Sequence, residues 1–408
     1  CDEIENGRQD DDLGIDVLAE LPRHRDADKH TRQRGQGAGL QQGQEVREEE
    51  HDKDTASETG GALNKAAADY NAFHKGQTVL AAVNGDLWMT AVHSGSAVSK
   101  KVLKVTRGIL MIDGEIWASQ QLDQENLGAT NAEKGTPAGN KAAFGVTSKN
   151  QPLVGSPDIR VTMTVNGKEV KADGINRLPA LNSLIVYNHR VNDANYALND
   201  AYEVELKVDD SSAFKAGGEI SAKVVAIYKS GAATRPSIGE KTILLTARGN
   251  RVSDLQNNFK VGDTVTFKTT LTDRMGRTDL WQDVQDAIGG HMQPIVDGKL
   301  AVANGDTTAY PASFVGYRDD GTVVLCSVTS TIDGSRAGLR FKDGYKFCTE
   351  MGFNSVFYLD GGGSCTFITL EEGANGTVKL HEMNAQLNGD LGALEDTADN
   401  AGNPKGKV

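Results

Sequence analysis

Four Asp-Gly or Asn-Gly pairs constrain the fold of this chain more than any other feature of its sequence. They are Asp113-Gly114, Asn166-Gly167, Asp297-Gly298 and Asp320-Gly321, and each lies between apolar or alternating runs. Asn, Asp and Gly tolerate the positive φ that a tight hairpin turn requires. We therefore expect each pair to join two neighbouring antiparallel strands, in a fold made mainly of antiparallel sheet.

Alternating runs beyond these turns predict the strands, because every second side chain of a half-buried strand faces the core. The runs are Asp158–Val165, Glu203–Val208, Ile220–Lys229, Lys241–Ala247 and Thr264–Leu271. Helical character is predicted only for short segments, which are Leu63–Phe73, Ser253–Lys260, Trp281–Ile288 and Lys342–Met351. The predicted class is α+β, a mostly antiparallel β-sheet domain with a few packed helices.

The last third of the chain predicts a C-terminal strand-helix-strand unit. Phe314–Gly316 and Thr322–Val328 form a predicted hairpin, and the helix Lys342–Met351 follows, with Gly352 as its C-terminal cap. The β-branched and aromatic run that begins at Ser355 then predicts a buried strand.

That strand ends in a loop typical of anion binding. Asp360 is followed by Gly361, Gly362, Gly363 and Ser364. Glycines let a ligand approach the backbone closely, and successive N–H groups can converge on one anion. The alternative is a tight turn that the Asp360 side chain caps. A nucleotide-binding P-loop is excluded, because no Gly-Lys-Ser/Thr follows.

A second apolar strand ends in the same manner. Gln77–Val83 predicts a buried strand, and it is followed by Asn84, Gly85 and Asp86. Functional residues often lie in loops at the ends of strands. A structural turn at Asn84-Gly85 is the alternative here too.

The bulk composition excludes some partners. The 408-residue chain carries a net charge of -13, whereas a nucleic-acid-binding protein would show a basic face. No nucleic-acid partner is therefore expected. No apolar run reaches the roughly 18 residues that a membrane-spanning helix needs. Cys326, Cys348 and Cys365 lack metal-site spacing, so we expect small buried thiols.

The two ends of the chain predict segments outside the folded domain. Residues 1–58 are a predicted disordered polar tether and residues 386–408 a flexible tail, which leaves one domain over 59–385. Cys1, followed by acidic and polar residues, is similar to the start of a mature bacterial lipoprotein. This predicts an extracytoplasmic protein, lipid-anchored through Cys1 at the periplasmic face or cell surface of a bacterial membrane. An arbitrary starting point of the sequence is the alternative.

Several motifs in order resemble the phosphodiester glycosidase domain family, which includes N-acetylglucosamine-1-phosphodiester alpha-N-acetylglucosaminidase and bacterial secreted proteins. The motifs are Val79–Trp88, Gly174–Arg177, Leu184–Tyr187, Ala287–Gly290 and Tyr358–Thr366. Their order is more specific than any one of them. The resemblance runs from about residue 60 to residue 385.

The resemblance implies a function and a set of site residues. Members of the family remove a sugar that is linked through its anomeric carbon to a phosphodiester. Asp360 would be the acid/base or the nucleophile, and Asp86, the second carboxylate, would hold sugar hydroxyls with Asn84. Gly361, Gly362, Gly363 and Ser364 would face the phosphate. Further candidates for ligand binding are Asn176, Arg177, Arg336 and His291, the last of which could equally be a surface loop histidine.

Two arginines of the family pattern are absent or displaced. Ala312–Gly316 stands where members carry Arg-Thr-Ala-Ile-Gly, and a family Asp-Gly-Arg is replaced by a segment in which Arg336 lies a few residues further on. A catalytically impaired carbohydrate- or phosphoglycan-binding surface lipoprotein is therefore the alternative to an extracytoplasmic hydrolase. No cofactor is expected, although Asp86 and Asp360 could share a Ca²⁺ ion, which prefers oxygen ligands.

Overall fold

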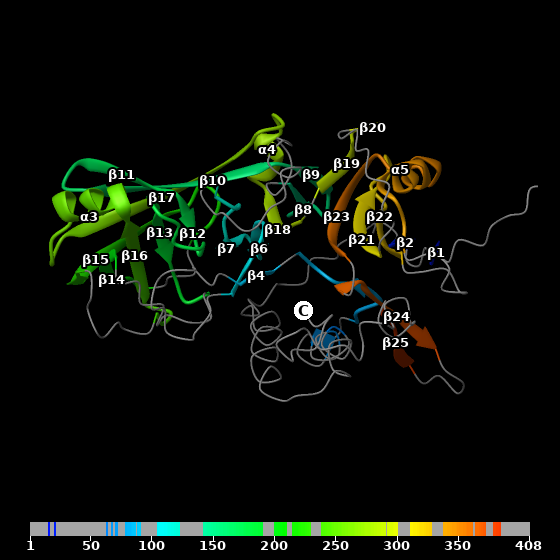
Figure 1. Cartoon of the computed structure of the whole chain (residues 1–408), viewed down its shortest axis with the longest axis horizontal. Helices are drawn as coiled ribbons and strands as arrows, with labels where there is room; N and C mark the ends of the chain where they lie inside the picture. The colour runs from blue at the N-terminus through cyan, green and yellow to red at the C-terminus, as the bar shows by residue number, and fades with distance from the viewer. Residues whose placement is uncertain are drawn as a thin grey trace, which may run out of the picture.

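The computed structural model of the chain describes it in segments, which together form an elongated row of β-sheets (Figure 1). The described residues are 15–16, 20–21, 63, 67, 70–71, 78–86, 88–90, 104–122, 142–190, 200–209, 214–229, 238–290, 292–300, 311–328, 338–361, 364–372 and 378–384. Strands outnumber helices throughout, and their pairings are antiparallel with one exception, between β12 and β13. The predicted α+β class with mainly antiparallel sheet is confirmed in these segments.

An eight-stranded sheet forms one end of the row, in the order β11-β10-β17-β15-β14-β16-β13-β12. Its strands are β10 (Pro157–Val165), β11 (Lys168–Ala172), β12 (Gly174–Ile175), β13 (Leu184–Tyr187), β14 (Ala201–Lys207), β15 (Glu219–Tyr228), β16 (Thr242–Arg248) and β17 (Thr264–Asp273). The sheet curls, so that β10 and β11 contact β12 and β13 and enclose a core that includes Phe214 and Phe267. A short 3₁₀ helix, η3 (Gly249–Arg251), leads into α3 (Val252–Asn258).

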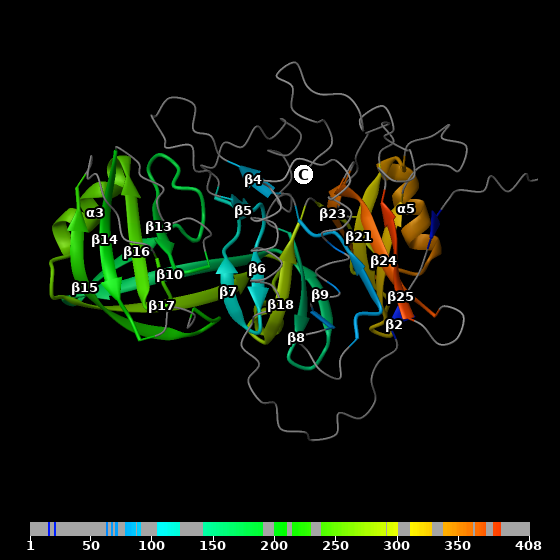
Figure 2. The ribbon, with the colours of Figure 1, turned by 90° about the horizontal axis from the view of Figure 1, so that it is seen from below.

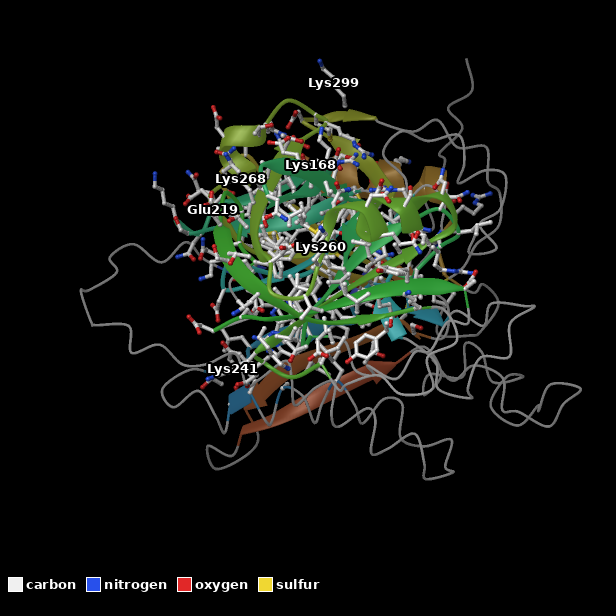
Figure 3. All side chains as sticks on the ribbon, turned by 90° about the vertical axis from the view of Figure 1, so that its left-hand side faces the viewer. Lys168, Glu219, Lys241, Lys260, Lys268 and Lys299 are labelled. Carbon is white, nitrogen blue, oxygen red and sulfur yellow. The ribbon has the colours of Figure 1, made fainter. Side chains whose placement is uncertain are left out.

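Alternation decides which side chains of this sheet face water. In β17, Phe267 is fully buried while its neighbour Lys268 is exposed. Lys268 lies opposite Glu219 of β15 in the strand register, and both side chains are on the outside at this end of the molecule (Figure 3). The predicted alternation is confirmed in β10 and β17. It is wrong for Glu203–Val208 and Lys241–Ala247, because β14 is buried at all but its last residue and β16 along its whole length.

A five-stranded sheet occupies the middle of the row, in the order β7-β6-β18-β8-β9 (Figure 2). Its strands are β6 (Leu110–Ile112), β7 (Glu115–Ala118), β8 (Ala143–Thr147), β9 (Pro152–Gly155) and β18 (Val284–Gly289). The whole eight-stranded sheet is inserted in the chain between β9 and β18. The sequence prediction of a helix over Trp281–Ile288 is wrong. The observed helix α4 (Thr278–Trp281) ends at the first residue of the predicted one. The residues that follow form the central strand β18, because they pair with β6 on one side and β8 on the other.

A seven-stranded sheet forms the other end, in the order β1-β22-β21-β23-β19-β20, with β2 also paired to β22. The strands are β1 (Ile15–Asp16), β2 (Glu20–Leu21), β19 (Met292–Val296), β20 (Lys299–Leu300), β21 (Ala312–Tyr317), β22 (Val323–Val328) and β23 (Ser355–Gly361). Between β22 and β23 the chain forms α5 (Phe341–Glu350), and Phe347 of α5 packs edge-on against Phe314 with 6.3 Å between ring centroids. Thus β1 and β2, from the part of the chain predicted as a tether, lie at the edge of this sheet.

Two small sheets complete the fold. One has the order β25-β24-β3, with β3 (Ala81–Val83), β24 (Thr366–Glu372) and β25 (Val378–Asn384), and the other pairs β4 (Trp88–Thr90) with β5 (Lys104–Thr106). The strand predicted over Gln77–Val83 is shorter than expected and only half-buried, because β3 is an edge strand that pairs with β24 alone. It nevertheless ends at Val83, as the sequence predicts.

The four predicted hairpin turns are present. Asp113, Asn166 and Asp297 have φ of 51°, 50° and 50°, and the glycine after each is also left-handed, which is the geometry of a two-residue turn. At Asp320-Gly321 only the glycine has a positive φ, 83°. That loop is one residue longer, because Arg318 still pairs with Thr322 through its N–H.

The predicted helices at α3 and α5 and the predicted cap are also confirmed. Gly352 follows α5 with φ of 74°. Cys326, Cys348 and Cys365 are buried free thiols, and burial raises the pKa of Cys326 to about 12. No helix in the described segments has the length and apolar character needed to cross a membrane.

The middle sheet is tightly packed at one point that bears on the site below. Gly289, the last residue of β18, donates its N–H to the carbonyl of Ile109 at 2.7 Å. A Cβ on Gly289 would lie 2.4 Å from Cα of Gly108, so the two glycines let the backbones touch.

Replacing Gly289 with Ala is expected to lower the unfolding free energy by about 2 kcal/mol or more, because the neighbouring atoms are backbone and cannot rotate away. Denaturant unfolding of the purified chain measures the loss. Gly239→Ala is the matched control, since a Cβ there would meet nothing within 4 Å. Equal unfolding midpoints for the two variants would contradict this packing.

Candidate functional site

The two predicted carboxylates belong to strand ends that meet at the junction of three sheets. Asp360 is the residue before the last of β23, and Asp86 follows the end of β3. The N–H of Asp360 donates to the carbonyl of Gly85 at 3.0 Å, which joins the two strand ends directly. Asp86 is 8% exposed and Asp360 7% exposed. Segments about 270 residues apart in the chain therefore meet at this point, and each carries a buried carboxyl group next to the contact.

The side-chain amide of Asn84 holds these strand ends in register. Its Oδ1 accepts from the Ser313 hydroxyl at 2.5 Å and from the N–H of Thr366 at 3.1 Å. Its Nδ2 donates to the carbonyl of Asp360 at 2.9 Å. The amide thus connects β3, β21, β23 and β24. Asn84 was predicted to hold sugar hydroxyls, and the structure instead places its amide among groups of the protein.

Asp86 is held from the loop that leads into β6. The N–H of Gly108 donates to Oδ2 of Asp86 at 2.5 Å. Gly108 is the glycine whose backbone touches Gly289, so the middle sheet fixes where this donor lies. A carboxylate oxygen that accepts a backbone N–H is held in one orientation. The loop Thr106–Gly108 therefore forms one wall beside Asp86.

Arg177 supports the same loop from behind. Its guanidinium donates to the carbonyl of Thr106 at 2.7 Å and to the carbonyl of Arg107 at 3.1 Å. The side chain has 0% exposure, and its position is fixed further by the Tyr187 hydroxyl, which donates to the Arg177 carbonyl at 2.6 Å. Arg177 was predicted to contact the ligand. The structure places it against the backbone of the Thr106–Gly108 loop, which it supports.

Asn176 joins the eight-stranded sheet to the middle sheet. It has φ of 50°, and its Nδ2 donates to the carbonyl of Trp117 and to Oδ1 of Asn188, each at 2.7 Å. Close by, Arg190 lies 4.2 Å over the Trp117 ring and pairs with Glu115. Asn176 was also predicted as a ligand-binding residue, and in the structure its amide serves this junction.

Burial dominates the electrostatics of Asp360. Desolvation raises the pKa of its carboxyl, because a charged group loses the stabilisation of water. The Ser364 hydroxyl, the Gly361 N–H at 2.8 Å and the positive charge of Arg107 oppose that rise in pKa. The Ser364 hydroxyl lies near the Asp360 carboxyl, but the distances and angles do not give it a hydrogen bond to any described residue. Its hydroxyl oxygen is buried beside this carboxyl.

Arg107 is the site residue that the sequence did not indicate. It lies in the loop between β5 and β6, half-buried, and its charge acts on Asp360, which is about 250 residues further along the chain. No motif surrounds it, and a lone Arg between a strand and a glycine is common on protein surfaces. Only the pairing of distant strands brings it to the carboxylates.

Four predicted site residues lie outside the described residues: Gly362, Gly363, His291 and Arg336. Their predicted roles stay predictions. The described residues hold no group of three or more His, Cys, Asp or Glu side chains arranged for a metal ion. The Ca²⁺ prediction therefore concerns only the pair Asp86 and Asp360.

Residues 216–392 match the phosphodiester glycosidase family. This confirms over that part of the chain the resemblance inferred from the motifs. The match includes Asp360 and Ser364, whereas Asp86 lies outside it and joins the site through the fold. No curated protein matches the sequence.

Similar solved structures include a hypothetical protein from Synechocystis, with 16% identity and a TM-score of 0.51, over 72% of this chain and 48% of that one. The chain thus spans about half the length of that protein. A protein of Burkholderia pseudomallei assigned as exported has 16% identity and a TM-score of 0.50, over 77% of this chain and 67% of that one. At these identities the likeness concerns the fold alone. The catalytic domain of zebrafish N-acetylglucosamine-1-phosphodiester alpha-N-acetylglucosaminidase aligns with a TM-score of 0.20 and 11% identity, too low for a structural argument.

Replacing Asp360 with Asn is expected to stabilise the protein at neutral pH. A carboxyl whose pKa is raised on folding favours the folded state at low pH, and that contribution is lost as the pH rises through the raised pKa. Asn has no charge to bury, so its contribution to stability does not change with pH. The unfolding free energy of the variant minus that of the wild type should therefore grow as the pH rises from about 4. The growth amounts to about 1.4 kcal/mol for every pH unit by which folding raises this pKa.

Denaturant unfolding of both chains from pH 4 to pH 8 measures this difference. A difference that stays constant over the range would contradict a raised pKa of Asp360.

Proposed function

We propose that the protein is a hydrolase that removes a sugar from a sugar-1-phosphodiester, with Asp360 and Asp86 as its catalytic carboxylates. The observation that carries the proposal is the direct backbone hydrogen bond, Asp360 N–H to the Gly85 carbonyl at 3.0 Å, which joins the two strand ends that carry these carboxyl groups. The family match over residues 216–392 supports a glycosidase-type hydrolase.

A pair of carboxylates suits cleavage at an anomeric carbon. The transition state resembles an oxocarbenium ion, and glycosidases use one carboxyl group for proton transfer and another as base or nucleophile. Burial raises the pKa of Asp360, which favours a protonated carboxyl that can donate a proton to the leaving phosphate oxygen. Asp86, oriented by the Gly108 N–H, would stabilise the positive charge that develops on the sugar ring.

The Gly361 to Ser364 loop would receive the phosphate. The Gly361 N–H donates to the Asp360 carboxyl at 2.8 Å, so the start of the loop lies against the proposed acid. The Ser364 hydroxyl lies beside the same carboxyl at the other end of the loop. Together they would place the phosphodiester next to the acid, with the sugar toward Asp86.

A second function is favoured by one observation. Ala312, which stands at the family's arginine position, is 3% exposed, and Ser313 beside it is committed to Asn84. A site without that arginine could bind a carbohydrate or phosphoglycan without turning it over.

Release of sugar from a panel of sugar-1-phosphodiesters distinguishes the two functions. Asp360→Asn is expected to lower kcat by about 10² to 10⁴, because the proton donor is lost. Asp86→Asn should lower kcat by about 10², because an uncharged amide stabilises the transition state less well. Both variants keep the shape of the native side chain.

Asp254→Asn is the control, since Asp254 lies in α3, in the eight-stranded part of the molecule, and pairs only locally with Arg251. It should retain wild-type turnover. Absence of release from every substrate by the wild type, with ligand binding intact, would favour the binding function. Wild-type turnover by Asp360→Asn would remove Asp360 from the mechanism.

A further inference from the structure

The backbone groups around Asn84 allow its side-chain amide only one orientation. Its Oδ1 lies 3.1 Å from the N–H of Thr366, which can only donate. Its Nδ2 lies 2.9 Å from the carbonyl of Asp360, which can only accept. A reversed amide would bring two donors together on one side and two acceptors together on the other.

The hydrogen-bonding capacity of this amide is used within the protein. Oδ1 accepts from the hydroxyl of Ser313 as well as from Thr366, and two bonds are the usual capacity of an amide oxygen. The two hydrogens of Nδ2 lie toward the carbonyls of Asp360, at 2.9 Å, and of Gly85, at 3.5 Å. The structure therefore gives Asn84 a task toward Asp360, whereas the sequence predicted a task toward the sugar.

Asp360 is held at both of its backbone groups by consecutive residues of one strand end. Its N–H donates to the carbonyl of Gly85, and its carbonyl accepts from the side chain of Asn84. Its carboxyl accepts the N–H of Gly361 at 2.8 Å. Because buried backbone groups must stay paired, Asp360 cannot shift without leaving one of them unpaired. The position of its carboxyl thus depends on Asn84.

Ser313 holds Asn84 in turn. Its side chain is fully buried, and its hydroxyl donates to Oδ1 of Asn84 at 2.5 Å. The family pattern Arg-Thr-Ala-Ile-Gly has Thr where this chain has Ser313. The chain therefore keeps a hydroxyl at this position, although it has Ala312 in place of the neighbouring arginine.

We propose that Asn84 is a positioning residue, which fixes the carboxyl of Asp360 by binding its backbone, and that Ser313 fixes the Asn84 amide. For the reaction that Asp360 performs, the proposal rests on the proposed function. It gives each residue of the Asn-Gly-Asp motif a separate task. Asn84 positions the acid, Gly85 supplies the carbonyl that pairs with it, and Asp86 is the second carboxylate.

Turnover of a sugar-1-phosphodiester by the full chain separates positioning from substrate binding. Asn84→Ala is expected to lower kcat by about 10-fold to 100-fold, because a misplaced proton donor slows the chemical step. KM should stay at the wild-type value, because the lost interaction does not involve the bound substrate. A raised KM with an unchanged kcat would show that Asn84 binds the sugar and would overturn the proposal.

Asn354→Ala is the matched control for lost stability. Asn354 is also half-buried, and its amide bonds to the side chains of Asp319 and Ser355 at the start of β23, the end of the strand away from Asp360. This variant should keep wild-type kcat. Equal losses of kcat in Asn354→Ala and Asn84→Ala would show a general effect of stability and overturn the proposal.

Variants of Ser313 test the second part of the proposal and make a milder change to the same contact. Ser313→Ala keeps the Asn84 amide but removes one bond that orients it, so kcat should fall by a smaller factor than in Asn84→Ala. Ser313→Thr keeps the hydroxyl and should restore turnover. Wild-type kcat in Ser313→Ala would overturn the part assigned to Ser313.

A titration without turnover separates failure of this proposal from failure of the proposed reaction. The carboxyl ¹³C signal of Asp360 follows its pKa, which burial raises. In Asn84→Ala the released backbone lets water reach the carboxyl, so this pKa should fall toward the ordinary value of Asp. The pKa should stay unchanged in Asn354→Ala.

The two proposals then have different outcomes. A lowered Asp360 pKa in Asn84→Ala, with no release of sugar by the wild type, would remove the reaction and leave Asn84 as the residue that positions Asp360. An unchanged or raised pKa in folded Asn84→Ala would overturn the positioning role, even if the wild type releases sugar.

Discussion

The site depends on a single backbone contact, the hydrogen bond from the Asp360 N–H to the Gly85 carbonyl. It joins the ends of two strands that belong to different sheets, β23 and β3, and so brings the residues that carry the two carboxyl groups to one junction. The Asn84 amide strengthens this contact by bonding to the Asp360 carbonyl on the same side. Because buried backbone groups must be paired, these strand ends cannot separate without a cost in free energy.

The cost of placing a carboxyl group at this junction is visible in its electrostatics. Burial raises the pKa of Asp360, while the Gly361 N–H, the Ser364 hydroxyl and the Arg107 charge partly offset it. A structure selected for stability alone would not bury an acid there. Sites that do chemistry commonly keep such groups, because a perturbed pKa is what lets a carboxyl transfer a proton near neutral pH.

The eight-stranded sheet takes part in the site although none of its residues contacts the carboxylates in the described bonds. Arg177 and Asn176, which follow β12, bond to backbone carbonyls of the loops and strands of the middle sheet. The inserted sheet therefore acts as a rigid support for the loop that carries Arg107. A change in that sheet could alter the site at a distance, through the position of this loop.

The sequence by itself determined the local parts of this protein. Alternation and the Asp-Gly and Asn-Gly pairs predict the strands and hairpins, and strand ends rich in Asp, Asn and Gly predict Asp86 and Asp360 as site residues, because these signals depend only on neighbouring residues. The prediction of a helix over Trp281–Ile288 was wrong, since strand pairing with β6 and β8 outweighs a weak local preference for helix. Only the tertiary structure decided the roles of Asn84, Arg177 and Arg107. Whether a polar side chain faces a ligand or a backbone carbonyl depends on which strands meet beside it, and no local pattern contains that information.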